Sequence, residues 1–180
     1  MKKILFLALA MLIPSFAGAA NYKANLNDAQ IAAIAVAANE VDIDAGNAAE
    51  SKSSNPEVKA FAHRMVADHT DVNKQATALV TKLKVTPEES TLSKSLRSDG
   101  QKNLDRLNKM DGKAFNKAYI YQEIAFHKQV LDVIDNMLLP SAKNEELKAL
   151  LVKVRGGISS HLEHAEKIQP VVDEMRDPAK

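Results

Sequence analysis

The feature that most constrains this chain is a long apolar stripe at helical spacing that begins after Asn55. Asn55 and Pro56 form a strong helix start, because the asparagine side chain can accept hydrogen bonds from free amides and proline suits the first helical position. Apolar residues then recur in steps of three and four, which predicts a helix over 56–84 with one buried face. His69 falls within this stripe, where a helical core normally holds an aliphatic side chain.

The same periodicity predicts four further helices and no strand, so we expect an all-α fold. The expected helices cover 28–52, about twenty residues from the capping box Thr86–Glu89, 113–138 up to Pro140, and 145–169 with a frayed tail after it. Gly46 and many alanines in the first helix predict close packing against a neighbour. Gly156 and Gly157 in the last helix indicate either a bend or close packing.

The third helix has a sparse apolar pattern, which indicates a position on the surface. If it runs back along the molecule, the helices over 56–84 and 113–138 become parallel. The fold is then a ferritin-like four-helix bundle with an extra crossover helix between the second and third bundle helices. The alternative is that this segment is a fifth member of the bundle.

The start of the chain predicts export. Lys2 and Lys3, the apolar run 4–13 and the small residues 17–19 are typical of a signal peptide over 1–19, which leaves a single domain over 20–180 with its core at about 27–170. Removing the two lysines leaves 22 of the 24 basic residues against 23 acidic ones. This balance gives no support for nucleic acid as a partner. No later segment is apolar enough to span a bilayer, so we expect a soluble periplasmic protein, with other envelope proteins as its partners.

The chain contains no cysteine, which excludes disulfides, thiolate metal sites and iron–sulfur clusters. Any metal would have to be held by imidazole and carboxylate groups. The sequence has neither a glycine-rich phosphate loop nor a nucleophile elbow, so no catalytic residue is assigned and a non-enzymatic role is favoured.

Four predicted helices each carry one polar residue within an apolar stripe: Asp42, His69, His127 and His161. His69 and His127 lie about thirteen and fourteen residues after the starts of their helices, whereas Asp42 and His161 lie about eight to ten residues before the ends of theirs. Because the second pair of helices is expected to run in the opposite direction, all four residues are predicted to lie at one level near the middle of the bundle.

Three imidazoles and a carboxylate at one level suit a divalent metal such as zinc, copper or iron. Glu123 lies one turn before His127 on the same face, and Asp68 and Tyr119 are candidate hydrogen-bond partners of the ligands. The predicted metal ligands are Asp42, His69, Glu123, His127 and His161. The alternative is that this polar layer only fixes the packing of a non-catalytic structural or interaction module of the cell envelope.

Four separate motifs resemble the bacterial domain of unknown function 4142 family. They are residues 39–46, residues 57–70, residues 104–115 with the later Tyr119 and His127, and His161-Leu162 with Ala165. The resemblance covers roughly residues 27–170 and implies a ferritin-like bundle in exported proteins, with no established activity. It also implies that Asp42, Asp68 and the three histidines are motif positions. The chain departs from the family pattern at Asp42, where glutamate is usual, and at Gly156, where proline is common.

The chain lacks the Glu-x-x-His pairs that build the di-iron centre of ferritins. Val66, Ile124 and Ile158 occupy the positions three residues before the histidines, and none of them can bind a metal. We therefore expect metal handling or envelope stress tolerance rather than di-iron oxidation chemistry.

Overall fold

The computed structural model describes residues 26–175, and this part of the chain is all-helical, as the sequence predicts. In chain order the elements are α1 (Asp28–Lys52), α2 (Pro56–Leu83), α3 (Thr91–Asn108), α4 (Gly112–Val133), the π-helical turn η2 (Ile134–Leu138), α5 (Leu139–Ser141) and α6 (Glu145–Glu174). The predicted signal peptide over 1–19 and the end of the tail lie outside the described residues.

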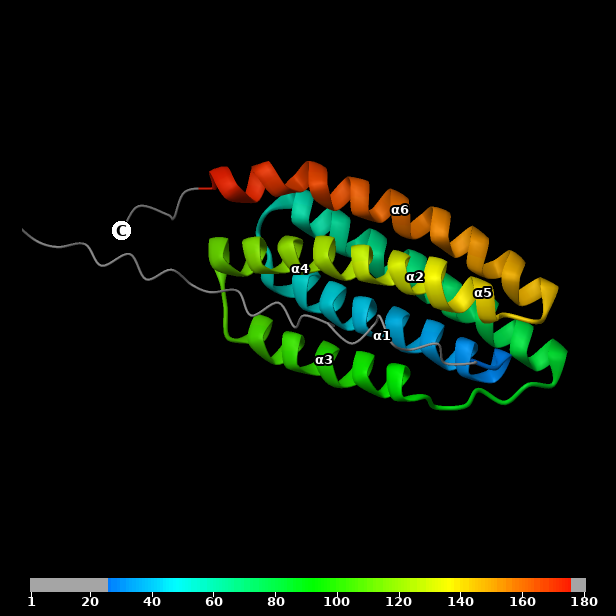
Figure 1. The fold of residues 1–180 in the computed structure, drawn as a ribbon. Helices are drawn as coiled ribbons and strands as arrows, with labels where there is room; N and C mark the ends of the chain where they lie inside the picture. Colours follow the sequence, from blue (N-terminus) through cyan, green and yellow to red (C-terminus); the bar gives the residue numbers. More distant parts are fainter. Residues whose placement is uncertain (1–25, 176–180) are drawn as a thin grey trace, which may run out of the picture.

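The long helices α1, α2, α4 and α6 lie side by side, and α3 lies against α1 (Figure 1). Figure 1 shows that α2 and α4 run in one direction and that α1 and α6 run in the other. The chain returns through α3 between α2 and α4, which allows these two helices to be parallel. Among the long helices, α1 packs most extensively on α2, and α4 packs most extensively on α6.

Gly46 lies where α1 contacts α2. A Cβ at this position would be 2.8 Å from Val66 Cγ2 and 3.2 Å from the Ala62 carbonyl oxygen, so glycine permits the close approach that the sequence predicts. By contrast, a Cβ at Gly156 or Gly157 would meet no atom of the described residues within 4 Å. Close packing is therefore the wrong interpretation of these two glycines.

The third helix begins later than predicted, at Thr91. Ser90, rather than Thr86, is its N-cap, and the Ser90 hydroxyl accepts a hydrogen bond from the Ser93 amide at 3.1 Å. The residues before it are tied to α1, because the Glu88 amide donates to the Ala29 carbonyl at 3.1 Å. This tertiary contact replaces the local cap that the sequence indicates.

The helix end predicted at Pro140 is wrong, and the last helix extends five residues beyond its predicted end at 169, through the turn that was expected to be frayed. Pro140 lies in α5, directly after the π turn in which the Leu139 amide donates to the Ile134 carbonyl. A local π turn can accommodate a proline, which has no amide to donate. α6 continues beyond Pro170 to Glu174, and Val172 in this last turn is completely buried in the core.

The core consists of two hydrophobic clusters with a polar layer between them. The first cluster contains the aromatic residues Phe61, Phe115 and Tyr119, and the second is aliphatic apart from Phe126. On each long helix, the polar residues singled out by the sequence are buried between the two clusters. The polar layer is therefore enclosed by apolar packing above and below.

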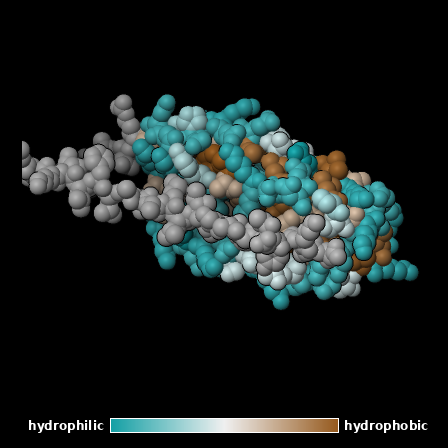
Figure 2. Space-filling model, viewed as in Figure 1, coloured by the Kyte–Doolittle hydropathy of each residue, from teal (hydrophilic) through white to brown (hydrophobic). Residues whose placement is uncertain are grey.

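The surface gives no sign of a membrane span. None of the helices within residues 26–175 is long and apolar enough to cross a membrane. Hydrophilic residues cover most of the face shown in Figure 2, and hydrophobic residues are visible in smaller areas between them. Among the described residues, Val152 is the one large hydrophobic side chain that is exposed.

We expect opposite stability changes when the two kinds of helical glycine are replaced. Gly156→Ala should raise the free energy of unfolding by about 1 kcal/mol, because alanine favours the helix and meets no neighbour. Gly46→Ala should lower it by about 1–3 kcal/mol, because the new methyl group forces α1 away from α2. Urea unfolding followed by circular dichroism measures both changes, and a stabilising Gly46→Ala would contradict the close packing described here.

Candidate metal centre

The long helices bring all five side chains that the sequence predicts as ligands into one layer of the core. Asp42 lies on α1, His69 on α2, Glu123 and His127 on α4, and His161 on α6, and none is more than 4% exposed. Nitrogen atoms of the three histidines lie within 4.8 Å of one another, and so do ligand atoms of Asp42, Glu123 and His127.

Each histidine uses one ring nitrogen for a hydrogen bond to the periphery of the layer. The three contacts are His69 Nδ1 with Asn39 Oδ1 at 2.8 Å, His127 Nδ1 with the Glu123 carbonyl at 2.9 Å, and His161 Nε2 with Asp68 Oδ2 at 2.8 Å. All three partners are acceptors. In a neutral imidazole, the nitrogen that faces an acceptor therefore carries the proton.

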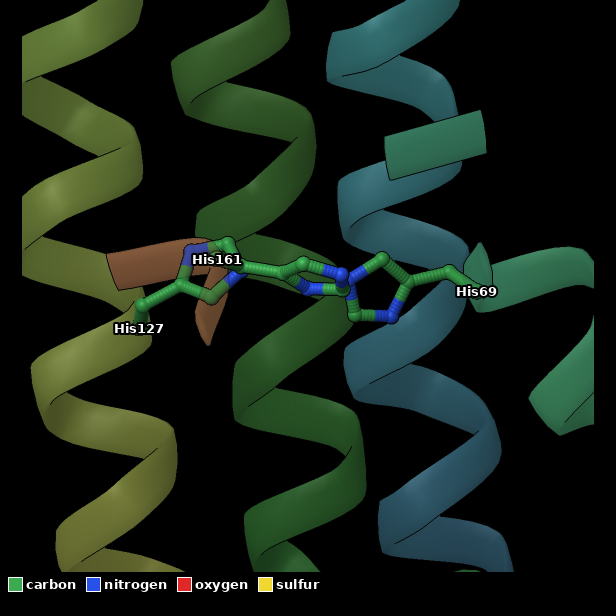
Figure 3. Close-up of side chains that lie close together, drawn as sticks. All are labelled: His69, His127 and His161. Carbon is green, nitrogen blue, oxygen red and sulfur yellow. The ribbon is translucent and has the colours of Figure 1, made fainter. Parts of the chain in front are cut away.

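The other ring nitrogen of each histidine faces the interior of the layer. His69 Nε2, His127 Nε2 and His161 Nδ1 are buried and make no hydrogen bond of good geometry among the described residues, although a carboxylate oxygen of Asp42 lies 3.1 Å from His69 Nε2. Figure 3 shows the three rings pointing toward one another, and their centroids are 5.2–5.9 Å apart. Since the outer nitrogens hold the protons, the inner nitrogens present three lone pairs to one enclosed space, as histidine ligands of a metal do.

The two carboxyl groups of the layer differ in protonation. Asp42 Oδ2 lies 3.1 Å from His69 Nε2 and 3.8 Å from His127 Nε2. Burial raises the pKa of Asp42, whereas the positive charge of the neighbouring histidines when they are protonated, together with a hydrogen bond from Glu123, lowers it. The pKa of Asp42 lies below its usual value as a result. Burial and the adjacent charge of Asp42 raise the pKa of Glu123 well above the usual value. Within this pair the negative charge is therefore favoured on Asp42 and the proton on Glu123.

This set of donors fits a divalent first-row metal. Around a tetrahedral ion with bonds of about 2.1 Å, the ligand atoms lie about 3.4 Å apart. The histidine nitrogens, which lie within 4.8 Å of one another, would have to move inward by less than about 1 Å each. Imidazole and carboxylate ligands suit zinc, copper and iron.

Comparison with known proteins gives a family but no activity. A family described as "Domain of unknown function (DUF4142)" matches residues 14–168. The chain belongs to this family. The resemblance inferred from the sequence motifs is thereby confirmed. No curated protein and no solved structure matches the chain, so the function of this DUF4142 member has to be argued from its own residues.

Asp68 and Tyr119 lie beside the layer, as the sequence suggests. Asp68 holds the outer nitrogen of His161 from the surface, where Arg64 also contacts its carboxylate at 3.3 Å. The pKa of Tyr119 lies well above the usual value. Burial is the largest cause, and the nearby Glu123 carboxyl group is the second largest. The Tyr119 phenol therefore remains protonated at the edge of the layer.

The remaining two histidines do not belong to the layer. His63 is exposed, and its Nδ1 lies 2.8 Å from a carboxylate oxygen of Glu50. His164 is half-buried, and its Nδ1 lies 3.4 Å from Arg64. The structure thus separates these residues from the three buried histidines.

Asn39 is the residue of this site that sequence reasoning missed. It is 4% exposed, and it orients His69 with its side-chain oxygen while its Nδ2 donates to Asn73 Oδ1 at 2.8 Å. Because Asn73 accepts from the amide nitrogen, the oxygen of Asn39 is left facing the imidazole. The sequence position of Asn39 could have identified it, because it lies one turn before Asp42 and therefore on the same face of the helix.

We expect the free energy of unfolding of the metal-free protein to fall as the pH decreases from about 6.5 toward 4. Burial lowers the pKa of His161 to about 4 and also lowers that of His69. In this pH range the unfolded chain, with histidine pKa values near 6.5, binds protons that the folded chain does not. The two neutral histidines therefore make their full contribution to the free energy of unfolding above pH 6.5. The part due to His161, up to about 3 kcal/mol, is lost as the pH falls to about 4.

Urea unfolding in the presence of a chelator, repeated between pH 4 and pH 7.5, measures this dependence. The variant His161→Asn cannot titrate in this range and should show a shallower pH dependence. Identical slopes for the variant and the wild-type protein would show that His161 is not held neutral by burial.

Proposed function

We propose that this protein binds one divalent metal ion inside its helical core, through His69, His127, His161 and Asp42, with Glu123 as a fifth ligand. The observation that carries the proposal is the set of three buried imidazole nitrogens that face one space. None of them makes a hydrogen bond of good geometry within residues 26–175, and the Asp42 carboxylate lies 3.1 Å from His69 Nε2. A buried polar atom without a partner costs about 1–3 kcal/mol. A metal ion offsets this cost for all three nitrogens at once.

The charges of the layer support a divalent cation. The three imidazoles are neutral ligands, and Asp42 contributes one negative charge in a site with almost no access to water. Glu123 contributes a second negative charge if it loses its proton on metal binding, which would neutralise a divalent ion. Zinc, copper and iron are the candidate metals, because each accepts imidazole and carboxylate ligands.

The wider arrangement supports a ferritin-like bundle. Four long helices surround the layer, and α3 connects the parallel helices α2 and α4. Because the positions that would form di-iron Glu-x-x-His pairs hold Val66, Ile124 and Ile158, we favour metal handling or envelope stress tolerance over oxidation chemistry. The predicted signal peptide over 1–19 supports a periplasmic location.

A polar layer that only fixes packing is the competing function. The outer hydrogen bonds of the three histidines would serve such a role. However, polar networks that specify packing are expected to satisfy their members. Here an oxygen of Glu123 and the hydroxyl of Tyr119, like the inner histidine nitrogens, make no hydrogen bond of good geometry among residues 26–175. These unsatisfied polar atoms favour a layer in which a bound ligand supplies the missing partners.

Protein without a histidine tag should take up one metal ion per chain when it is reconstituted with zinc, copper, iron or manganese and then desalted. His69→Ala and His127→Ala should each weaken the binding at least a hundredfold, because each removes a direct ligand. Elemental analysis and competition with a chromophoric chelator measure stoichiometry and affinity.

The matched control is His63→Ala, which removes an exposed histidine from the same helix as His69 and should leave metal binding unchanged. Circular dichroism shows whether each variant remains helical. If none of the four metals binds stoichiometrically, the layer has a structural role and the proposed function is wrong.

Asn39→Ala should weaken metal binding by about 10–100-fold while the protein keeps all its ligands. The substitution removes the acceptor that fixes His69 Nδ1 as the protonated nitrogen. Asn47→Ala, an exposed asparagine on the same helix, is the control for helix propensity. Equal affinities for the two variants would mean that Asn39 does not orient the imidazole.

A further inference from the structure

A largely but not completely enclosed cavity of about 50 Å³ lies directly beside the candidate metal centre. Asp42 and His69 form part of its wall, and from there it extends between α1, α2, α4, η2 and α6. Leu79, Leu138 and Ile158 are among the aliphatic residues that line the rest. The cavity therefore has one end at the polar layer and the remainder in the aliphatic half of the core.

The sequence explains why space remains on this side of the layer. Ala32, Ala35 and Ala38 of α1 and Ala76 of α2 line the cavity, and each fills little volume. In the opposite half, the first hydrophobic cluster contains three large aromatic side chains that are completely buried. The π turn η2 also borders the cavity through Ile134 and Leu138, and π turns occur frequently at functional sites.

The wall chemistry determines what can occupy this space. A cavity needs about 10–15 Å³ to hold one water molecule, so this one is large enough for more than one. A buried water requires two to four polar partners, and apolar cavities stay dry and take up apolar molecules such as xenon. Apart from Asn39, Asp42, His69 and Gln129, the lining is apolar, so most of the cavity offers water no hydrogen bond.

We propose that this cavity binds a small, uncharged, apolar molecule, of the class to which dioxygen belongs, next to the metal. The first part of this inference, that the cavity binds an apolar molecule, does not require an ion. The second part, that the molecule lies next to the metal, rests on the proposed function. A molecule at the inner end would contact the layer from the Asp42 and His69 side. The opposite approach, past Asp68 and His161, is polar and partly exposed, so the two sides of the layer differ in what they admit.

Xenon tests whether the cavity binds a small apolar molecule. Methyl NMR spectra of the metal-free protein under increasing xenon pressure should show saturable shifts for Leu79, Val154 and Ile158, which line the cavity. Val58 and Ile168, which are buried in the other cluster, should not shift. Absence of saturable shifts around the cavity, or equal shifts in both halves, overturns the inference.

Two matched variants test the location. Ala76→Leu fills the cavity and should abolish the xenon response, whereas Ala67→Leu places the same side chain on the exposed face of α2 and should preserve it. A full response in Ala76→Leu overturns the assignment of this cavity. If Ala76→Leu does not fold, the methyl shifts of the wild-type protein decide the question by themselves.

The second part is tested with the metal in place. Bound xenon should relax much faster in protein loaded with paramagnetic manganese than in protein loaded with zinc, because the cavity adjoins the ligands. Equal relaxation overturns the claim that the molecule lies beside the metal. Failure of metal uptake with a normal xenon response overturns only the proposed function, and normal metal uptake without a xenon response overturns only the cavity.

Discussion

Burying ionisable side chains in a core of helices is the constraint on which the rest of this structure depends. His69, His127 and His161 each satisfy one ring nitrogen with an acceptor on or near their own layer. The other nitrogen is left unsatisfied, at a cost of about 1–3 kcal/mol for each such group. The helices can hold these positions because buried apolar clusters lie on both sides. Hydrogen bonds outside the layer and apolar packing around it thus hold the three imidazoles in place.

The two halves of the core contribute to this layer in different ways. In one half, the large side chains of Phe61, Phe115 and Tyr119 are completely buried on one side of the imidazoles. The other half is built from aliphatic residues and alanines and retains a cavity beside Asp42. Because α1 packs mainly on α2 and α4 mainly on α6, an ion bound by Asp42, His69, His127 and His161 would also connect the two helix pairs.

Much of the architecture could be predicted, because helical periodicity and caps are local signals. The all-α fold and the close approach at Gly46 follow from the sequence, and so does the burial of His69 within an apolar stripe. Local signals failed where a tertiary contact competed with them. The capping box at Thr86 is unused because the following segment bonds to α1, and Pro170 lies inside a helix whose last turn buries Val172.

The sequence by itself determined which side chains enter the core layer, because the spacing of polar and apolar residues along a helix fixes the face on which each lies. Only the tertiary structure decided which nitrogen of each imidazole faces inward. That choice depends on acceptors from other turns and other helices, such as Asn39 for His69 and Asp68 for His161. The cavity next to Asp42 was likewise beyond the sequence, because empty volume depends on how the side chains of several helices fit together.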